Sequence, residues 1–421
     1  SLYRLRFLPR QAGWHRYTIE VRAAGQAPCE LSRSGQFFVR PSERTGPVRI
    51  DPDHPWHFVR EGSQTHYFWN GTTTYWLLGW QDPQIIHAIL DRLARLKVNR
   101  IRVALCGRTT SGARWDEPLV APTDQFQFRL EPFAAARPTN IEDPGLDVAR
   151  YNVPFWRKCD DLVSYANRLG IVVSIIFYLD GRDPGVDPFG KQLAGGDDEQ
   201  RYYRYGLARL ASHPNVMWDV TNEYHLFRDE AWTEKMGALI KRFDPYQHLT
   251  SVHGHGEFRF RTSRWADFAL FQSWDEHGGY EFMLKNRRQQ QEAGRPMPQI
   301  NEEYGYEDHY PGRWGEGRKP PARSGDNRRR LAWQMVMAGG YQTTGERADQ
   351  GTGKGADTGG GWINGRGNGH MVVGHHHPAR RIIAPPARGW QVDLRPGMGR
   401  TASRFGRLAM DVAVDEPGRQ T

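Results

Sequence analysis

The chain has 421 residues, of which 38% are hydrophobic, 12% aromatic and 25% charged. This composition is typical of a globular protein with a sizeable core and excludes a disordered or fibrous one. Apolar runs fall short of the roughly 18 to 20 residues that a membrane-spanning helix needs, so we expect no membrane-embedded segment. Cys29, Cys106 and Cys159 show no CxxC spacing and predict buried thiols, neither a disulfide framework nor a zinc site.

The formal net charge of +9 invites a polyanion-binding interpretation. The stretch 365–421, however, holds nine arginines, no lysine and four acidic residues, so about half of the excess charge lies there. The preceding residues are only mildly basic, and we do not expect nucleic acid to be the partner. A polyanion-binding protein remains a rival, to be distinguished by a steep loss of binding with ionic strength.

Residues 1–47 show short alternating strand patterns separated by Gly and Pro turns, as in WHRYTIEV (14–21) and GQFFV (35–39). This pattern predicts a β-sandwich, but three or four strands are too few to close one. We therefore expect a partial N-terminal β-sandwich in residues 1–47. No secretory leader is visible before this segment.

From residue 48 to about 367, short apolar runs alternate with amphipathic helical stretches, which indicates βα units around a parallel sheet. Eight strands favour a closed (β/α)8 TIM barrel over an open sheet, and no GxGxxG motif supports dinucleotide binding. The insertion 108–150 is expected to be a loop at the catalytic face. The predicted strands are 67–70, 99–105, 171–179, 216–221, 249–253, 268–273, 299–302 and 340–344, and the predicted helices are 83–96, 153–169, 199–210, 230–243, 280–292 and 327–338.

Residues 368–421 differ in composition from the rest of the chain, because Arg, Gly, Pro and Ala dominate and Trp390 and Phe405 are the only aromatics. We interpret them as an atypical C-terminal tail that folds poorly. Disorder is one explanation of this composition, and a change of reading frame is another.

Two carboxylates follow strands that lie opposite each other in a barrel. Glu223 ends the fourth strand in WDVTNEY (218–224), and Glu303 ends the seventh in PQINEEYGY (298–306). Barrel enzymes build their sites at the C-terminal ends of strands. A retaining glycosidase needs two carboxyl groups about 5 to 5.5 Å apart, one to protonate the leaving oxygen and one to attack the anomeric carbon. A lone Glu at either place would more often be a salt bridge or cap; the pair favours catalysis.

The motifs Asn222-Glu223 and Glu303-Tyr304-Gly305 resemble those of the clan A retaining glycoside hydrolases. More narrowly, the sequence resembles the bacterial apiosidase-like glycosidases, whose barrel follows an N-terminal β-sandwich. The resemblance covers residues 1 to about 367. It is carried by FWNGT (68–72), WDVTNE (218–223), NEEYGYE (301–307) and GGYQTTGE (339–346).

This resemblance implies that Glu223 is the general acid/base and Glu303 the ionised nucleophile. Glu302 is a rival nucleophile, but consecutive strand residues point to opposite sides of a sheet, which favours Glu303. Asn222 would hydrogen-bond the sugar hydroxyl beside the reacting carbon. Arg102 would either keep the nucleophile ionised or close a structural ion pair.

Other polar and aromatic residues near predicted strand ends are candidates for substrate binding, since aromatic faces stack on sugar rings and polar groups read hydroxyls. Packing or loop structure explains each of them singly as well, but the fifteen tryptophans of the chain favour sugar binding. The candidates are Asn70, Tyr178, Asp180, His253, His255, Gln272, Trp274, Tyr304, Tyr306 and Glu346.

We predict neither a metal nor another cofactor. The pair His253 and His255 and the run 375–377 lack a placed carboxylate or thiolate to complete a metal shell. The sequence therefore predicts a secreted or periplasmic bacterial glycoside hydrolase acting on an oligo- or polysaccharide, with a plant or algal glycan as one option. A non-catalytic carbohydrate-binding protein on the same barrel is the alternative. The sugar, endo or exo action and the oligomeric state stay open.

Overall fold

The computed structural model divides the chain into two compact units, one of Ser1–Thr45 with Ile382–Thr421 and one of Gly46–Arg381. The structure describes residues 4–23, 32–108, 126–127, 129–140, 142–179, 181–182, 185–273, 279–304, 325–344 and 408–415. None of the helices in these ranges is long and apolar enough to cross a membrane.

The first unit contains a three-stranded antiparallel sheet in the order β17-β1-β2. Strand β1 (Gly13–Ala23) pairs with β2 (Ser32–Val39) on one side and with β17 (Leu408–Asp415) on the other. Within the described residues this is a single layer, so the predicted sandwich is not established. Strand β17 also shows that part of the atypical tail forms regular structure; the rest of 368–421 lies outside the described residues.

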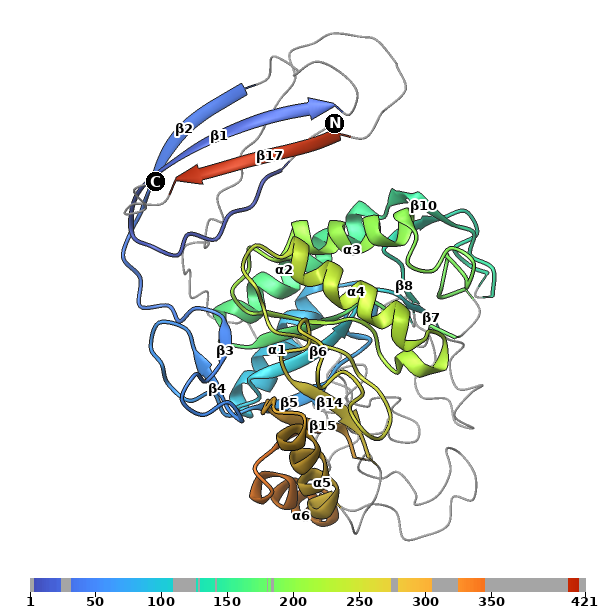
Figure 1. The fold of residues 1–421 in the computed structure, drawn as a ribbon. Helices are drawn as coiled ribbons and strands as arrows, with labels where there is room; N and C mark the ends of the chain where they lie inside the picture. The colour runs from blue at the N-terminus through green and yellow to red at the C-terminus, as the bar shows by residue number, and fades with distance from the viewer. Residues whose placement is uncertain are drawn as a thin grey trace. The chain divides into compact units, whose positions relative to one another are not determined.

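The second unit is a (β/α)8 barrel, as predicted (Figure 1). Its parallel strands follow the order β13-β12-β11-β6-β5-β16-β15-β14. A parallel bridge joins Gln272 of β14 to His255, four residues after β13, and closes the ring. The strands are β5 (Asn70–Thr73), β6 (Arg100–Ala104), β11 (Val172–Ile176), β12 (Val216–Asp219), β13 (Thr250–Ser251), β14 (Ala269–Gln272), β15 (Gln299–Glu303) and β16 (Tyr341–Thr344).

Seven of the eight strands overlap their predicted positions over most of their length, and the first is shifted. Residues 67–70 were predicted to be a strand, but β5 begins at Asn70, because Tyr67 and Trp69 pack under the barrel instead. The shift moves Asn70 from the C-terminal end of the strand to its N-terminal end. It therefore changes which residues can reach the catalytic face.

Helices surround the sheet, and polar caps with N-terminal prolines define where several begin. Asp82 accepts a hydrogen bond from the backbone of Gln84 ahead of α1, and Asn152 caps α2 in the same way. In Figure 1, α5 and α6 lie side by side. The helices are α1 (Pro83–Arg95), α2 (Val153–Arg168), α3 (Asp197–Leu210), α4 (Glu230–Phe243), α5 (Gly279–Glu292) and α6 (Gly325–Met337).

The N-terminal end of the barrel is closed by the hairpin β3 (Val48–Ile50) and β4 (Phe58–Arg60). Phe58 is fully buried, stacks on Trp69 at 5.4 Å between ring centroids and contacts Phe268 edge-on at 5.8 Å. This apolar plug fills the end where the strands begin. Polar side chains of the barrel interior are consequently gathered at the other end, where the strands finish.

The described parts of the insertion 108–150 form two small antiparallel pairs. Strand β7 (Gly107–Arg108) pairs with β8 (Arg129–Leu130), and β9 (Phe133–Ala135) pairs with β10 (Leu146–Tyr151). Because β7 follows the C-terminal end of β6, the insertion starts on the predicted catalytic side of the barrel.

Candidate active site

A bulge at the end of β15 brings two consecutive glutamates into the barrel interior. Phe271 of β14 pairs with Asn301, whereas the next residue, Gln272, pairs with Glu303. Glu302 is therefore an extra residue in the ladder, and a bulge of this kind redirects neighbouring side chains. The expectation that Glu302 and Glu303 point to opposite sides of the sheet is wrong, because strict alternation applies only to a regular strand.

Glu302 is fully buried and is held by two arginines of β6. Its Oε1 contacts Arg100 Nη1 and lies 2.9 Å from Arg102 Nε. Its Oε2 accepts a hydrogen bond from the Thr343 hydroxyl at 3.1 Å. Both oxygens are thus engaged in the barrel core, and Glu302 balances charge that would otherwise be buried without a partner.

Glu303 lies nearer the barrel mouth and is 4% exposed. Its Oε1 accepts a hydrogen bond from the Tyr75 hydroxyl and lies 3.4 Å from Arg102 Nη1. Gln272 Nε2 donates to its Oε2 at 3.0 Å. Donors on both oxygens and an adjacent guanidinium stabilise the negatively charged form of this carboxyl group.

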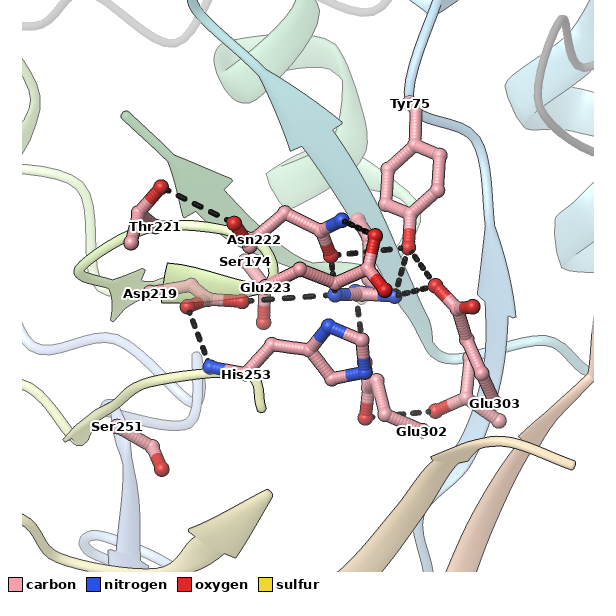
Figure 2. A network of polar contacts seen from close by, with 12 residues as sticks. Tyr75, Ser174, Asp219, Thr221, Asn222, Glu223, Ser251, His253, Glu302 and Glu303 are labelled. Carbon is pink, nitrogen blue, oxygen red and sulfur yellow. Dashed lines mark hydrogen bonds and ion pairs between the residues drawn. The ribbon is translucent and has the colours of Figure 1, made fainter. Parts of the chain in front are cut away.

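Tyr75 and Asn222 connect Glu303 to the second carboxylate, as Figure 2 shows. The Tyr75 hydroxyl accepts from Arg102 Nη1 and lies 3.2 Å from Asn222 Oδ1. Arg102 Nη2 donates to the same Asn222 oxygen at 2.9 Å. Asn222 Nδ2 donates to Glu223 Oε2 at 3.4 Å, so one continuous network joins Glu223 to Glu303.

Glu223 follows β12 in a left-handed backbone conformation, with φ of 44° and ψ of 54°. This conformation is disfavoured for residues with a Cβ atom, by about 1 kcal/mol or more, and is found most often at functional sites. Hydrogen bonds from Asn222 N to Tyr178 O at 3.0 Å and from Tyr224 N to His253 O at 3.3 Å hold the chain on either side. The side chain is half-buried, so it is more accessible than Glu303.

Asp219 and His253 are buried beside this network. Asp219 is 1% exposed, and burial raises the pKa of its carboxyl group to about 7, although the Arg102 charge acts to lower it. Burial, followed by the positive charge of Arg102, holds the pKa of His253 well below its usual range, so its imidazole is neutral. The His253 ring points into the network in Figure 2, yet neither ring nitrogen has a hydrogen-bond partner among the described residues.

The remaining sequence candidates fall into three groups. Tyr304 is buried and donates to Gln342 Oε1 at 3.0 Å, and His255 is exposed beside His225, with ring centroids 6.3 Å apart. Tyr178 and Asn70 are not brought to the site. Asp180, Trp274, Tyr306 and Glu346 lie outside the described residues.

Tyr178 and Asn70 are corrections to the substrate-binding prediction. The Tyr178 hydroxyl donates to the buried Glu199 of α3 at 3.0 Å, so the ring packs into the helix layer. Asn70 donates to the backbone oxygen of Lys97 at 2.8 Å at the opposite end of the barrel, because β5 starts there. Neither side chain joins the network around Glu303.

Sequence reasoning missed Tyr75 and Asp219. Tyr75 follows β5 by two residues, and a correct boundary for that strand would have identified it as a strand-end residue. Asp219 lies inside the motif that contains Asn222 and Glu223, but its own sequence position gives no sign that it faces Arg102. Across the described ranges there is no group of three His, Cys, Asp or Glu side chains placed to hold a metal ion.

The (β/α)8 barrel carries two carboxylates at the C-terminal ends of its fourth and seventh strands, which is an arrangement of the kind that glycoside hydrolysis by paired carboxyl groups uses. Residues 57–344 match the family described as "Apiosidase-like, catalytic domain", and the chain belongs to this family. It is therefore a glycosidase with a carbohydrate substrate. No curated protein matches the chain.

Solved structures with the same barrel include two from Bacteroides vulgatus ATCC 8482. One is described as a candidate glycoside hydrolase and has 22% identity and a TM-score of 0.59, with 83% of this chain and 71% of that chain covered. The other, a family 5 glycoside hydrolase, has 19% identity and a TM-score of 0.51, with 71% and 61% covered. A third structure, described only as a glycoside hydrolase, has 18% identity and a TM-score of 0.52, with 71% and 65% covered. The chain thus spans 61% to 71% of the length of these proteins, and the similarity establishes the fold.

Proposed function

We propose that the chain hydrolyses an O-glycosidic bond with retention, using Glu303 as the nucleophile and Glu223 as the general acid/base. The observation that carries this proposal is the difference in the surroundings of the two carboxyl groups. Glu303 is surrounded by donors from Tyr75, Gln272 and Arg102 that stabilise a carboxylate. Glu223 is half-buried and is positioned by Asn222, which leaves it accessible to a leaving group or a water molecule.

In the first step, the Glu303 carboxylate attacks the anomeric carbon while the glycosidic C–O bond breaks, and Glu223 gives its proton to the departing oxygen. The product is a covalent glycosyl ester on Glu303 and an alcohol. In the second step, Glu223 removes a proton from water, the water oxygen attacks the anomeric carbon, and the ester bond to Glu303 breaks. Each carboxyl group returns to its starting state.

The neighbouring side chains have separate roles in this scheme. Asn222, fixed by Arg102 Nη2, would contact the sugar hydroxyl beside the reacting carbon, where a hydrogen bond strengthens in the transition state. Tyr75 would hold Glu303 in position for attack. Glu302 is excluded as the nucleophile because two arginines and a threonine occupy its oxygens in the core.

The test combines variants with product stereochemistry. Glu303→Gln and Glu223→Gln are expected to fold and to lose turnover by about three orders of magnitude or more. Glu257→Gln, which removes a carboxylate paired with Lys285 and Arg261, should keep it. Proton NMR of the initial product should show the substrate's anomeric configuration. Normal turnover in both variants would contradict the proposal, inverted product would contradict retention, and binding without turnover in the wild type would favour a non-catalytic carbohydrate-binding protein.

We further infer that the natural substrate is an oligo- or polysaccharide met outside the cytoplasm, by a secreted or periplasmic bacterial protein. The glycosidase family and the aromatic-rich sequence support this inference. A plant or algal glycan fits the mildly basic barrel. Activity screening on neutral and acidic glycans tests it, and steep salt dependence of binding to nucleic acid would instead indicate a polyanion-binding protein.

A further inference from the structure

The guanidinium of Arg102 is held by a different carboxylate at each of its three nitrogens. Glu302 lies 2.9 Å from Nε, Glu303 lies 3.4 Å from Nη1 and Asp219 lies 3.6 Å from Nη2. Arg102 itself is fully buried. A planar guanidinium that is held at three corners cannot rotate without losing an ion pair. Its donors to the reacting groups are therefore fixed in direction.

The contact of Arg102 with Asp219 differs from its contacts with Glu302 and Glu303. The same nitrogen, Nη2, also donates to Asn222 Oδ1 at 2.9 Å. Asp219 Oδ1 accepts from the backbone nitrogen of His253 at 3.2 Å, whereas Oδ2 faces Arg102 and makes no hydrogen bond within the described residues. Asp219 is 1% exposed, and its two carboxylate oxygens face Arg102 and the His253 backbone.

We propose that Asp219 is a positioning residue for the reaction: it fixes Arg102 Nη2 between its own carboxylate and the Asn222 amide, and its ionisation sets the charge near Glu303 and Glu223. This inference rests on the proposed function and adds to it a group that acts through Arg102. Asp219 would act on the reaction in two ways: it would fix the position of Asn222 through Arg102, and its buried charge would change the electrostatic potential at the two glutamates.

The electrostatic part follows from the charges that face Asp219. Arg100 and Arg102 come from β6, Glu302 from β15, His253 from the segment after β13 and Tyr203 from α3. With Asp219 ionised, two buried arginines face three carboxylates; with Asp219 protonated, the arginines and carboxylates balance. Since burial raises the pKa of Asp219 to about 7, the change falls within the working range of an ordinary enzyme.

An ionised Asp219 adds negative charge near Glu223 and favours the protonated form that the first step requires. Asp219→Asn removes this charge, so the alkaline limb of the pH profile of kcat/KM should move to lower pH by roughly half a unit to one unit. We also expect kcat to fall about tenfold while KM changes little, because the Asn222 contact strengthens in the transition state.

The matched control is Asp244→Asn. Asp244 is also buried and accepts a hydrogen bond from Trp218, the residue before Asp219, but none of its contacts reaches the network. Its loss should lower thermal stability and leave both limbs of the pH profile in place. If Asp219→Asn behaves in this same way, Asp219 is a structural residue and the inference is wrong.

A second measurement applies if Asp219→Asn does not fold. With 13C at the aspartate carboxyl carbons, the wild-type resonance that is missing from Asp219→Glu should titrate between pH 6 and 8; if that resonance does not titrate in this range, the inference is wrong. If the pH profile of Asp219→Asn matches that of the wild type while Glu303→Gln and Glu223→Gln are inactive, only this inference is wrong. If Glu303→Gln and Glu223→Gln are both fully active, the proposed function is wrong and this inference with it.

Discussion

Glu302 and Glu303 are consecutive residues of β15, and both contact the guanidinium of Arg102. The bulge that pairs Gln272 with Glu303 makes this possible, because it places Glu302 outside the regular alternation of the strand. One glutamate consequently stabilises the barrel core while the other reaches the mouth. Two identical side chains therefore have different roles, and substitutions at the two positions should have different effects on stability and activity.

Glu302→Gln is expected to destabilise the protein far more than Glu303→Gln. The Glu302 carboxylate compensates two fully buried arginines, and removing one partner of a buried ion pair costs about 3 to 5 kcal/mol. Glu303 is close to the mouth, and Gln keeps its shape. Urea unfolding of the two variants measures the difference; equal free energies of unfolding would contradict the assignment of Glu302 to the core.

Tyr75→Phe should lower kcat without unfolding the protein. The hydroxyl contacts Glu303, Asn222 and Arg102, and a hydrogen bond to a charged group contributes about 1.5 to 3 kcal/mol, which corresponds to roughly a tenfold to 150-fold loss. Steady-state kinetics of purified protein checks this value. Tyr178→Phe is the control, since its hydroxyl contacts Glu199 away from the site and kcat should stay at the wild-type level.

Asp244 should make stability depend on pH in the acid range. It accepts hydrogen bonds from His248 Nδ1 at 2.8 Å and Trp218 Nε1 at 2.8 Å, and although burial acts to raise its pKa, these and other contacts lower it to about 2. A lowered folded-state pKa adds stability above the unfolded value near 4, and this stability is lost as the pH falls toward 2. The contribution is about 2 kcal/mol.

Thermal unfolding of wild type and Asp244→Asn between pH 2 and 7 measures this dependence. The Tm difference between the two proteins should be largest above pH 4 and shrink as the pH approaches 2. A difference that stays constant over this range would show that the ionisation of Asp244 does not contribute.

Gly237→Ala in α4 should destabilise the protein, against the usual preference of helices for alanine. A Cβ atom at Gly237 would lie 2.2 Å from the Trp265 ring, which is buried, so the ring or the helix would have to move. Such overpacking costs about 1 to 3 kcal/mol. Ala238→Gly, on the exposed side of the same helix, should cost only the propensity difference of about 1 kcal/mol. Urea unfolding compares the two; a stabilising Gly237→Ala would contradict the packing.

Several residues of the network were predicted from the sequence because barrel enzymes use a fixed part of each strand. Glu223 and Glu303 follow apolar runs with clear periodicity, and placing those runs as the fourth and seventh strands brings the two residues together. Asn222 and Arg102, also expected near them, lie in the same network. Tyr178 and Asn70 lie outside the network for local reasons. Because β5 starts at Asn70, this residue lies at the N-terminal end of the strand, and the Tyr178 hydroxyl is directed to Glu199 of α3.

Hydrophobic periodicity, which is a local property of the sequence, predicted the six helices, seven of the eight barrel strands and the two strand ends that carry Glu223 and Glu303. Tertiary packing places Glu302 of β15 in the core, brings the Tyr75 hydroxyl to Glu303, and lets Asp219 and Asn222 contact the same nitrogen of Arg102. These relationships join residues that are distant in sequence. They depend on a bulge, a shifted strand boundary and buried charges, whose effects arise only when the strands pack around a common interior.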